Sequence, residues 1–311
     1  MGSNFMINVI FSVSMASLWS MVEVVQIIVF VPLFENLKFP VNAQTMNKSL
    51  IRAVTFDIID TQQWFDPSFV TWDDGTPHSI NFEESGFDTI WFLHNSSTIV
   101  WIYCLHFVMF LVYLLIRAIY RRCGRLKGLH QKLARYFFYN GMIRLFTETF
   151  IDLYVTSLLN IVAANWKTSS ALISASNVAS VVVFALCNLT VLLLAFVYFR
   201  KFGEMNAQSN YGALLEGTKL DAKRKSKWNL LLPAFLFGRR ICFTLSLLLI
   251  RHFLWAQIAV MFLFSTAMVI FLLTMKPFES PTATKLEVFN EVTLTMLSYG
   301  LMMFTDFVPD P

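Results

Sequence analysis

The sequence predicts an all-α fold: a polytopic membrane helix bundle of about seven spans, with a luminal or extracellular cap loop between spans one and two. Three observations support this fold class. The 311 residues are 56% hydrophobic and 14% charged, with a mean hydropathy of +0.59, whereas soluble domains are about 45–50% apolar. Seven apolar stretches are long enough to cross a bilayer. Basic residues gather in alternate loops, as they do on the cytoplasmic side of membrane proteins.

Apolar stretches and polar loops divide the chain into five parts. These are the first span (1–34), a non-cytoplasmic acidic cap loop (35–96), spans two to four with a basic cytoplasmic loop (97–199), a cytoplasmic linker (200–229) and spans five to seven (230–311). The predicted spanning segments are residues 6–32, 98–120, 136–162, 172–199, 230–250, 254–275 and 286–304. The first stretch lacks a basic segment and is too long for a signal peptide, so it is predicted to be a span.

The distribution of Lys and Arg predicts the orientation. Loops assigned to the cytoplasm contain seven, seven and two basic residues, whereas the outer loops contain three, one and one. This bias places the N-terminus inside and the C-terminus outside. Within span five, Pro233 and Gly238 are expected to separate a bent or interfacial half-helix from the main span.

The predicted cap loop is acidic and contains two N-glycosylation sequons. Asn47-Lys48-Ser49 and Asn95-Ser96-Ser97 match the acceptor pattern. A luminal or extracellular loop would expose both, so Asn47 and Asn95 are predicted glycosylation sites. The carboxylates of the loop lack EF-hand spacing, and no metal site is predicted.

Span three carries a polar stripe inside an apolar segment. Successive positions four residues apart rotate by only about 40° on a helix, so such a series stays near one face. A charge at the centre of a span costs at least about 2.5 kcal/mol, so the stripe is expected to face protein or water. It is a candidate functional site, with ion-paired helix packing as the alternative. Its members are Asn140, Arg144, Glu148, Asp152, Thr156 and Asn160.

Further intramembrane polar residues are predicted in spans five and seven. Arg239 and Arg240 lie in span five, and Glu287, Asn290 and Glu291 open span seven. We expect the arginine pair to neutralise acids of span three or span seven, most simply Glu287 and Glu291 at the same depth. A membrane-open groove beside the two arginines would instead favour a lipid-handling protein.

The motifs of common enzyme classes are absent from the sequence. There is no Walker loop, Rossmann glycine pattern, HExxH, GxSxG or CxxC. The sequence therefore predicts no enzyme and no cofactor, and its small net charge of +4 does not favour nucleic acid. The expected partners are the lipid bilayer, anionic lipid at the basic cytoplasmic loops, and either a second copy of the chain or the other subunits of a membrane complex.

Three segments carry a resemblance to a known group of proteins. Residues 278–307 (FESPTATKLEVFNEVTLTMLSYGLMMFTDF), residues 140–161 (NGMIRLFTETFIDLYVTSLLNI) and residues 39–61 (FPVNAQTMNKSLIRAVTFDIIDT) resemble the multi-pass C-terminal membrane region of ciliate surface proteins with cysteine-rich repeats. The layout is also similar to transient-receptor-potential-like membrane regions of the flavin-carrier type. The resemblance implies a polytopic membrane region and assigns no chemistry. The cysteine-rich ectodomain of those proteins does not occur in this sequence.

Two functions follow from these observations. The first is a channel-like or transporter-like protein in which the stripe of span three lines a cation path. The second is a structural membrane anchor or assembly subunit of a surface or organellar complex, without transport activity. The predicted location is the cell surface or an endomembrane, and a mitochondrial membrane is the alternative.

Overall fold

The structure is a computed structural model, and nearly all the residues that it describes are helical. It describes residues 21–35, 37, 41–54, 77–123, 128, 130, 141–163, 166, 171–200, 231–278 and 280–305. Within these ranges there is no β-strand, as the predicted all-α class requires. The helices are Met21–Leu33, called here the N-terminal helix, α2 (Val41–Val54), α4 (Ile80–Glu84), α5 (Phe92–Asn95), α6 (Ser97–Cys123), α8 (Gly141–Ala163), α9 (Ala171–Arg200), α10 (Leu231–Leu249), α11 (Leu254–Met275), α12 (Pro281–Leu301) and the 3₁₀ turn Met302–Phe304.

Five of these helices are long and apolar enough to cross a membrane, as in an integral membrane protein. They are Ser97–Arg122, Leu145–Ala163, Ala171–Leu193, Leu231–Leu249 and Leu254–Met275. The predicted first span begins outside the described residues, and its described part is the shorter apolar N-terminal helix. The predicted seventh span corresponds to α12, which carries three charged residues, Lys285, Glu287 and Glu291. The count of seven spans and the cap loop therefore stay predictions.

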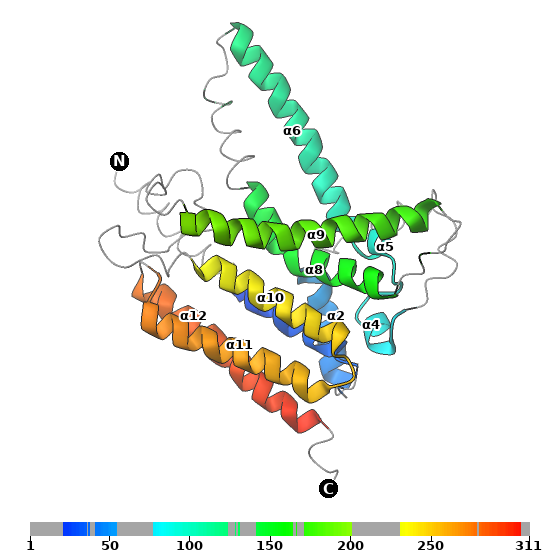
Figure 1. The fold of residues 1–311 in the computed structure, drawn as a ribbon, viewed down its shortest axis with the longest axis vertical. Coiled ribbons are helices and arrows are strands. Elements are labelled where there is room, and N and C mark those ends of the chain that lie inside the picture. Colours follow the sequence, from blue (N-terminus) through cyan, green and yellow to red (C-terminus); the bar gives the residue numbers. More distant parts are fainter. Residues whose placement is uncertain are drawn as a thin grey trace.

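From α8 onward, consecutive long helices run in opposite directions and pack side by side. Figure 1 shows α10, α11 and α12 as neighbours, with the N-terminal helix behind α10. A short turn at 250–253 joins α10 to α11 at one end of the bundle, and 276–280 joins α11 to α12 at the other. The main apolar core lies among the N-terminal helix, α8, α10, α11 and α12, with Phe30 and Phe34 fully buried at its centre.

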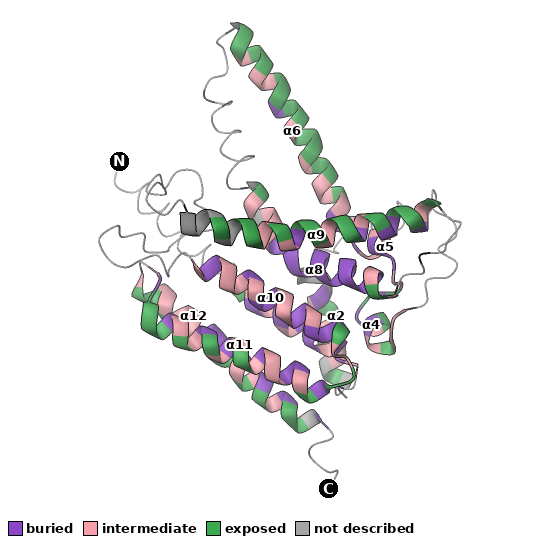
Figure 2. Ribbon diagram, in the orientation of Figure 1, coloured by how far each residue is buried: buried purple, intermediate pink, exposed green. Residues whose placement is uncertain are grey.

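Helix α8 lies inside the bundle, whereas α6 projects from it. Every residue of 148–160 in α8 is buried, and α8 contacts α9, α10 and α5. In Figure 2, α8 is mostly purple and α6 mostly green. Only 11% of the most apolar part of α6 is buried inside the protein. The polar stripe of span three therefore lies on the most enclosed of the five long apolar helices.

The expected break in span five does not form. From Leu231 to Leu249 the chain is one continuous helix that includes Pro233 and Gly238. Pro233 lies in the first turn of the described helix, where the backbone N–H has no intrahelical partner in any case, so the ring is tolerated. One uninterrupted helix then carries Arg239 and Arg240 into the bundle.

The α11–α12 connection contains a residue in the left-handed conformation. Lys276 has φ 47° and ψ 60°, and its N–H donates to the carbonyl oxygen of Leu272. A left-handed residue other than glycine is strained by about 1–2 kcal/mol, because Cβ approaches the following carbonyl oxygen. Ser280 is extended, and Pro281 occupies the first turn of α12, where proline is favoured.

Replacing Lys276 with glycine should stabilise the protein. Lys276→Gly removes the strained Cβ and should raise the free energy of unfolding by up to about 1 kcal/mol. Thermal unfolding of the detergent-solubilised protein measures the change. The matched control is Lys285→Gly, within α12, which should lower stability by about 1 kcal/mol because glycine is unfavourable inside a helix. A fall in melting temperature for Lys276→Gly would contradict the strain argument.

Candidate functional site

Arg240 is the centre of a buried charge cluster that joins three helices. Its side chain is 1% exposed. Its Nη1 donates to the carbonyl oxygen of Thr147 in α8 at 2.7 Å, and its Nη2 donates to Oε1 of Gln26 at 3.2 Å. Glu23 Oε1 lies 3.7 Å from the same Nη2. The guanidinium of α10 thus connects α8 to the N-terminal helix.

Gln26 completes this connection from the other side. Its Nε2 donates to the backbone carbonyl of Glu148 at 2.8 Å, while its Oε1 accepts from Arg240. Gln26 is 1% exposed, so both polar atoms of its amide depend on protein partners. The carboxylate charge of Glu148 also interacts electrostatically with Arg240. The cluster is therefore held both by charged side chains and by hydrogen bonds to the backbone carbonyls of Thr147 and Glu148 in α8.

Arg239 points to a different helix from Arg240. It forms an ion pair with Glu291 of α12, whose side chain is 1% exposed. This contact agrees with the expected neutralisation of Glu291 by the arginine pair. Arg240 instead turns to Glu23, which the predicted pairing did not include. Glu287 is half-buried on α12, and Asn290 is buried there.

The C-terminal half of the stripe on α8, called the outer half after its predicted orientation as opposed to the N-terminal inner half, is a hydrogen-bonded junction. Asn160 Oδ1 accepts from the backbone N–H of Phe92 and from Ser176 Oγ, both at 2.8 Å. Its Nδ2 donates to Oδ1 of Asn177 at 2.8 Å. Thr156 Oγ1 lies 2.7 Å from Ser96 Oγ. These bonds hold α5 and Ser96, which precede α6, against α8, and they also join α8 to α9.

The inner half of the stripe is also enclosed by protein. Glu148 is 6% exposed and Asp152 is 5% exposed, and each interacts with other groups of the chain. Arg144 belongs to α8, but its side chain and all of Asn140 lie outside what the structure describes. The four stripe residues with described side chains thus face other helices.

Several buried polar atoms of Arg240 and of the Arg239–Glu291 pair lack hydrogen-bond partners within the described part of the chain. They include Nε of Arg239, Nε of Arg240 and Oε2 of Glu291. A small cavity, with room for about one water molecule, lies beside Arg239. Its other lining residues are Ile27, Phe243, Val260, Met261, Phe264 and Ser265. Because both arginines are at least 96% buried, no open lipid groove lies beside their described side chains.

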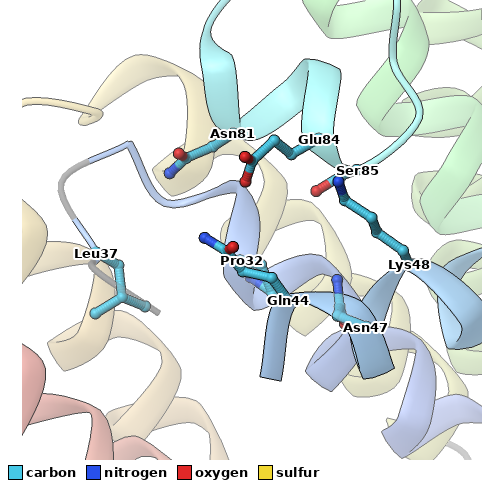
Figure 3. A pocket seen from close by; sticks show the side chains of 8 residues that line it. All are labelled: Pro32, Leu37, Gln44, Asn47, Lys48, Asn81, Glu84 and Ser85. Carbon is cyan, nitrogen blue, oxygen red and sulfur yellow. The ribbon is translucent and has the colours of Figure 1, made fainter. Parts of the chain in front are cut away.

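A second, polar cavity lies between the end of the N-terminal helix, α2 and α4 (Figure 3). It has room for one or two water molecules, far less than the roughly 300 Å³ of an ordinary ligand pocket. Figure 3 shows Asn47 at its wall, and the Nδ2 of Asn47 donates to the carbonyl oxygen of Val29 at 3.1 Å. The full lining is Pro32, Leu37, Gln44, Asn47, Lys48, Asn81, Glu84 and Ser85.

Both sequon asparagines use their amide groups within the fold. Besides the bond of Asn47, Asn95 Nδ2 donates to the carbonyl oxygen of Thr89 at 2.7 Å. Asn95 also ends α5, two residues before α6 begins. Glycosylation would require each amide to leave its partner, and modification at Asn47 and Asn95 stays a prediction.

No group of three or more His, Cys, Asp or Glu side chains in the described ranges could hold a metal ion. Comparisons of the chain with protein-family models, curated proteins and solved structures gave no match. The class of protein is therefore defined by its own helices, as a polytopic membrane helix bundle. The resemblance to ciliate surface proteins stays an expectation from sequence.

Sequence reasoning identified the charged members of the site but did not predict which neutral side chains bind them. Gln26, Ser96, Ser176 and Asn177 are fully or almost fully buried and hold the two halves together. The available signal was the presence of amide and hydroxyl side chains inside apolar segments, where such groups need partners.

Removing the Asn160 side chain should loosen the outer junction. Asn160→Leu removes the hydrogen bonds to the Phe92 N–H, Ser176 Oγ and Asn177 Oδ1, which should cost about 1–3 kcal/mol of stability. Thermal unfolding in detergent measures the loss. The control is Thr190→Val on α9, because the hydroxyl of the half-buried Thr190 bonds, within the described part of the chain, only to the Leu186 carbonyl of its own helix. Equal losses of stability in Asn160→Leu and Thr190→Val would show that the hydrogen bonds of the junction do not stabilise the protein.

The Arg239–Glu291 pair should show strong coupling in a double-mutant cycle. Arg239→Met leaves a carboxylate buried without its counter-charge and should destabilise the protein by about 3–5 kcal/mol, while Arg239→Met with Glu291→Met should recover most of the loss. Denaturant unfolding of both variants and of Glu291→Met gives the coupling energy. Arg121→Met serves as a control, because Arg121 is exposed and the substitution should change stability little. Strictly additive effects would mean that the two side chains do not interact.

Proposed function

We propose that this protein is a structural membrane anchor or assembly subunit, in which the intramembrane charges join helices to one another. One observation carries the proposal: the stripe residues Glu148, Asp152, Thr156 and Asn160 are each at most 6% exposed. A conducting stripe would face a hydrated path, whereas these side chains face other helices of the same chain.

The contacts of the stripe favour a packing role at both ends. At the inner end, the backbone of Thr147 and Glu148 accepts from Arg240 and Gln26. At the outer end, Asn160 uses both atoms of its amide in bonds to α5 and α9. Neither of the two cavities described above is lined by a stripe residue. Polar groups arranged in this way are typical of helix association within a bilayer.

Flux and stability measurements on the same variants test the proposal. Proteoliposomes with the wild-type chain should pass cations and protons no faster than protein-free liposomes. Glu148→Gln and Asp152→Asn should leave that flux unchanged and lower the melting temperature in detergent by several degrees, because each disturbs a buried polar contact. The matched control is Glu83→Gln, an exposed carboxylate of α4, which should change neither quantity. Wild-type flux that Asp152→Asn abolishes would overturn the anchor function.

A channel-like or transporter-like function is the second candidate, favoured by the balance of buried charge. Among the described side chains, three carboxylates are buried, Glu148, Asp152 and Glu291, against two guanidiniums, Arg239 and Arg240. An excess of acid inside a membrane attracts cations and protons. This candidate requires a hydrated path that reaches Asp152, and the flux assay above decides between the two functions.

The proposed partners follow from the surfaces outside the cluster. The five long apolar helices imply a lipid bilayer around the bundle. Arg117, Arg121 and Arg122 near the end of α6 are placed to contact anionic head groups. A second copy of the chain, or the other subunits of a surface or organellar complex, would complete an anchor. The cell surface or an endomembrane is the proposed location.

A further inference from the structure

Three charged or titratable side chains from separate segments meet at one end of the bundle. Glu35 follows the N-terminal helix, His78 precedes α4, and Arg251 lies in the turn between α10 and α11. Arg251 Nη1 lies 3.0 Å from His78 Nε2 and 3.6 Å from Glu35 Oε1, and His78 Nε2 lies 3.5 Å from the same Glu35 oxygen. In the view of Figure 1, α4 lies near the end of α10.

The contact with Arg251 favours a neutral His78. A guanidinium can only donate hydrogen bonds, so the contact with Arg251 Nη1 needs an unprotonated Nε2 on His78. Protonation would remove the acceptor and place an imidazolium 3.0 Å from a guanidinium. The opposing influence is Glu35, whose carboxylate attracts the protonated ring. Within the described part of the chain these are the charged groups facing His78, and His252 accepts from Nε of Arg251.

Outside this cluster, hydrogen bonds of Asn81 and two buried phenylalanines hold the α4 segment, residues 77–87, against the bundle. Asn81 Nδ2 donates to the carbonyl oxygen of Phe34 at 2.7 Å. Phe82 is 1% exposed and packs against Phe87, which also contacts Phe30. The His78 ring packs edge-on against Phe82, with ring centroids 5.4 Å apart. Because α4 has only five residues, its position depends on these contacts and not on intrinsic helix stability.

We propose that Glu35, His78 and Arg251 form an acid-sensitive latch, which holds the α4 segment on the bundle at neutral pH and releases it when His78 is protonated. The released segment would uncover the small polar cavity and the apolar surface under Phe82. The latch is independent of the proposed anchor function, since it lies outside the long helices and involves no stripe residue.

The direction of the pH effect follows from the surroundings of His78. Burial lowers the pKa of His78 from its ordinary value of 6.5, Glu35 acts against that shift, and Arg251 adds to it. A histidine whose pKa is lower in the latched state binds protons more weakly there than after release. The latch therefore keeps its full strength above about pH 6.5 and loses strength as the pH falls below that value.

Hydrogen–deuterium exchange of the full chain in nanodiscs tests the latch between pH 7.5 and pH 5. Rates are corrected for the intrinsic pH dependence of exchange, and peptides of α11 serve as the internal reference. Protection of peptides covering 77–87 should fall at acid pH, by up to about tenfold for each unit by which the pKa of His78 differs between the two states. His78→Gln should abolish this pH dependence, whereas the control His130→Gln should keep it. An unchanged pH response in His78→Gln would overturn the proposal.

Two further variants separate a latch from a merely structural ion pair. Glu35→Gln removes the group that favours the protonated ring, so it should enlarge the acid-induced loss of protection. Arg251→Gln removes the group that opposes protonation, so it should reduce the loss. A purely structural Glu35–Arg251 pair would change the response of both variants in the same direction, and that result would overturn the proposal even if His78→Gln failed to fold.

Discussion

The arrangement of the bundle depends on the burial of Arg240. Taking a guanidinium out of water is expensive, and the penalty is offset only where its N–H groups find acceptors and a counter-charge. Arg240 finds the Thr147 carbonyl in α8, and Gln26 and Glu23 in the N-terminal helix. These partners come from two separate parts of the chain, so that with α10 itself the contacts join three helices. A rotation of any of the three helices would break at least one of the contacts.

The same constraint explains why α8 is the most enclosed of the long apolar helices. Its polar side chains occupy one side of the cylinder, and each needs a partner that lipid cannot supply. The charge cluster satisfies the inner end, and Asn160 with Ser176 and Asn177 satisfies the outer end. Apolar helices such as α6 carry no such requirement and are free to lie at the periphery. Polarity inside the membrane thus determines which helices are central.

The sequence was sufficient to predict the class of fold and the charged part of the site. Hydropathy identified the apolar helices, and the four-residue spacing identified the stripe, because both are local properties of the chain. The partner of each charge was harder to predict. Arg239 and Arg240 are adjacent, yet they point to α12 and to the N-terminal helix respectively, a choice that depends on helix rotation. The continuous α10 shows a related limit, because the effect of Pro233 depends on its distance from the start of the helix.

The projecting helix α6 gives the molecule a part whose orientation depends on the lipid itself. The stretch that precedes its first arginine, residues 97–116, extends about 30 Å at 1.5 Å per residue, which matches the roughly 30 Å hydrocarbon core of an average bilayer. In a thinner or thicker membrane, the difference in length is relieved by tilting of the helix or by local deformation of the bilayer. The rest of the bundle is fixed by internal charges, but α6 has few protein contacts to oppose a tilt. Membrane thickness would therefore set the angle between α6 and the bundle, and with it the position of the basic residues at its end.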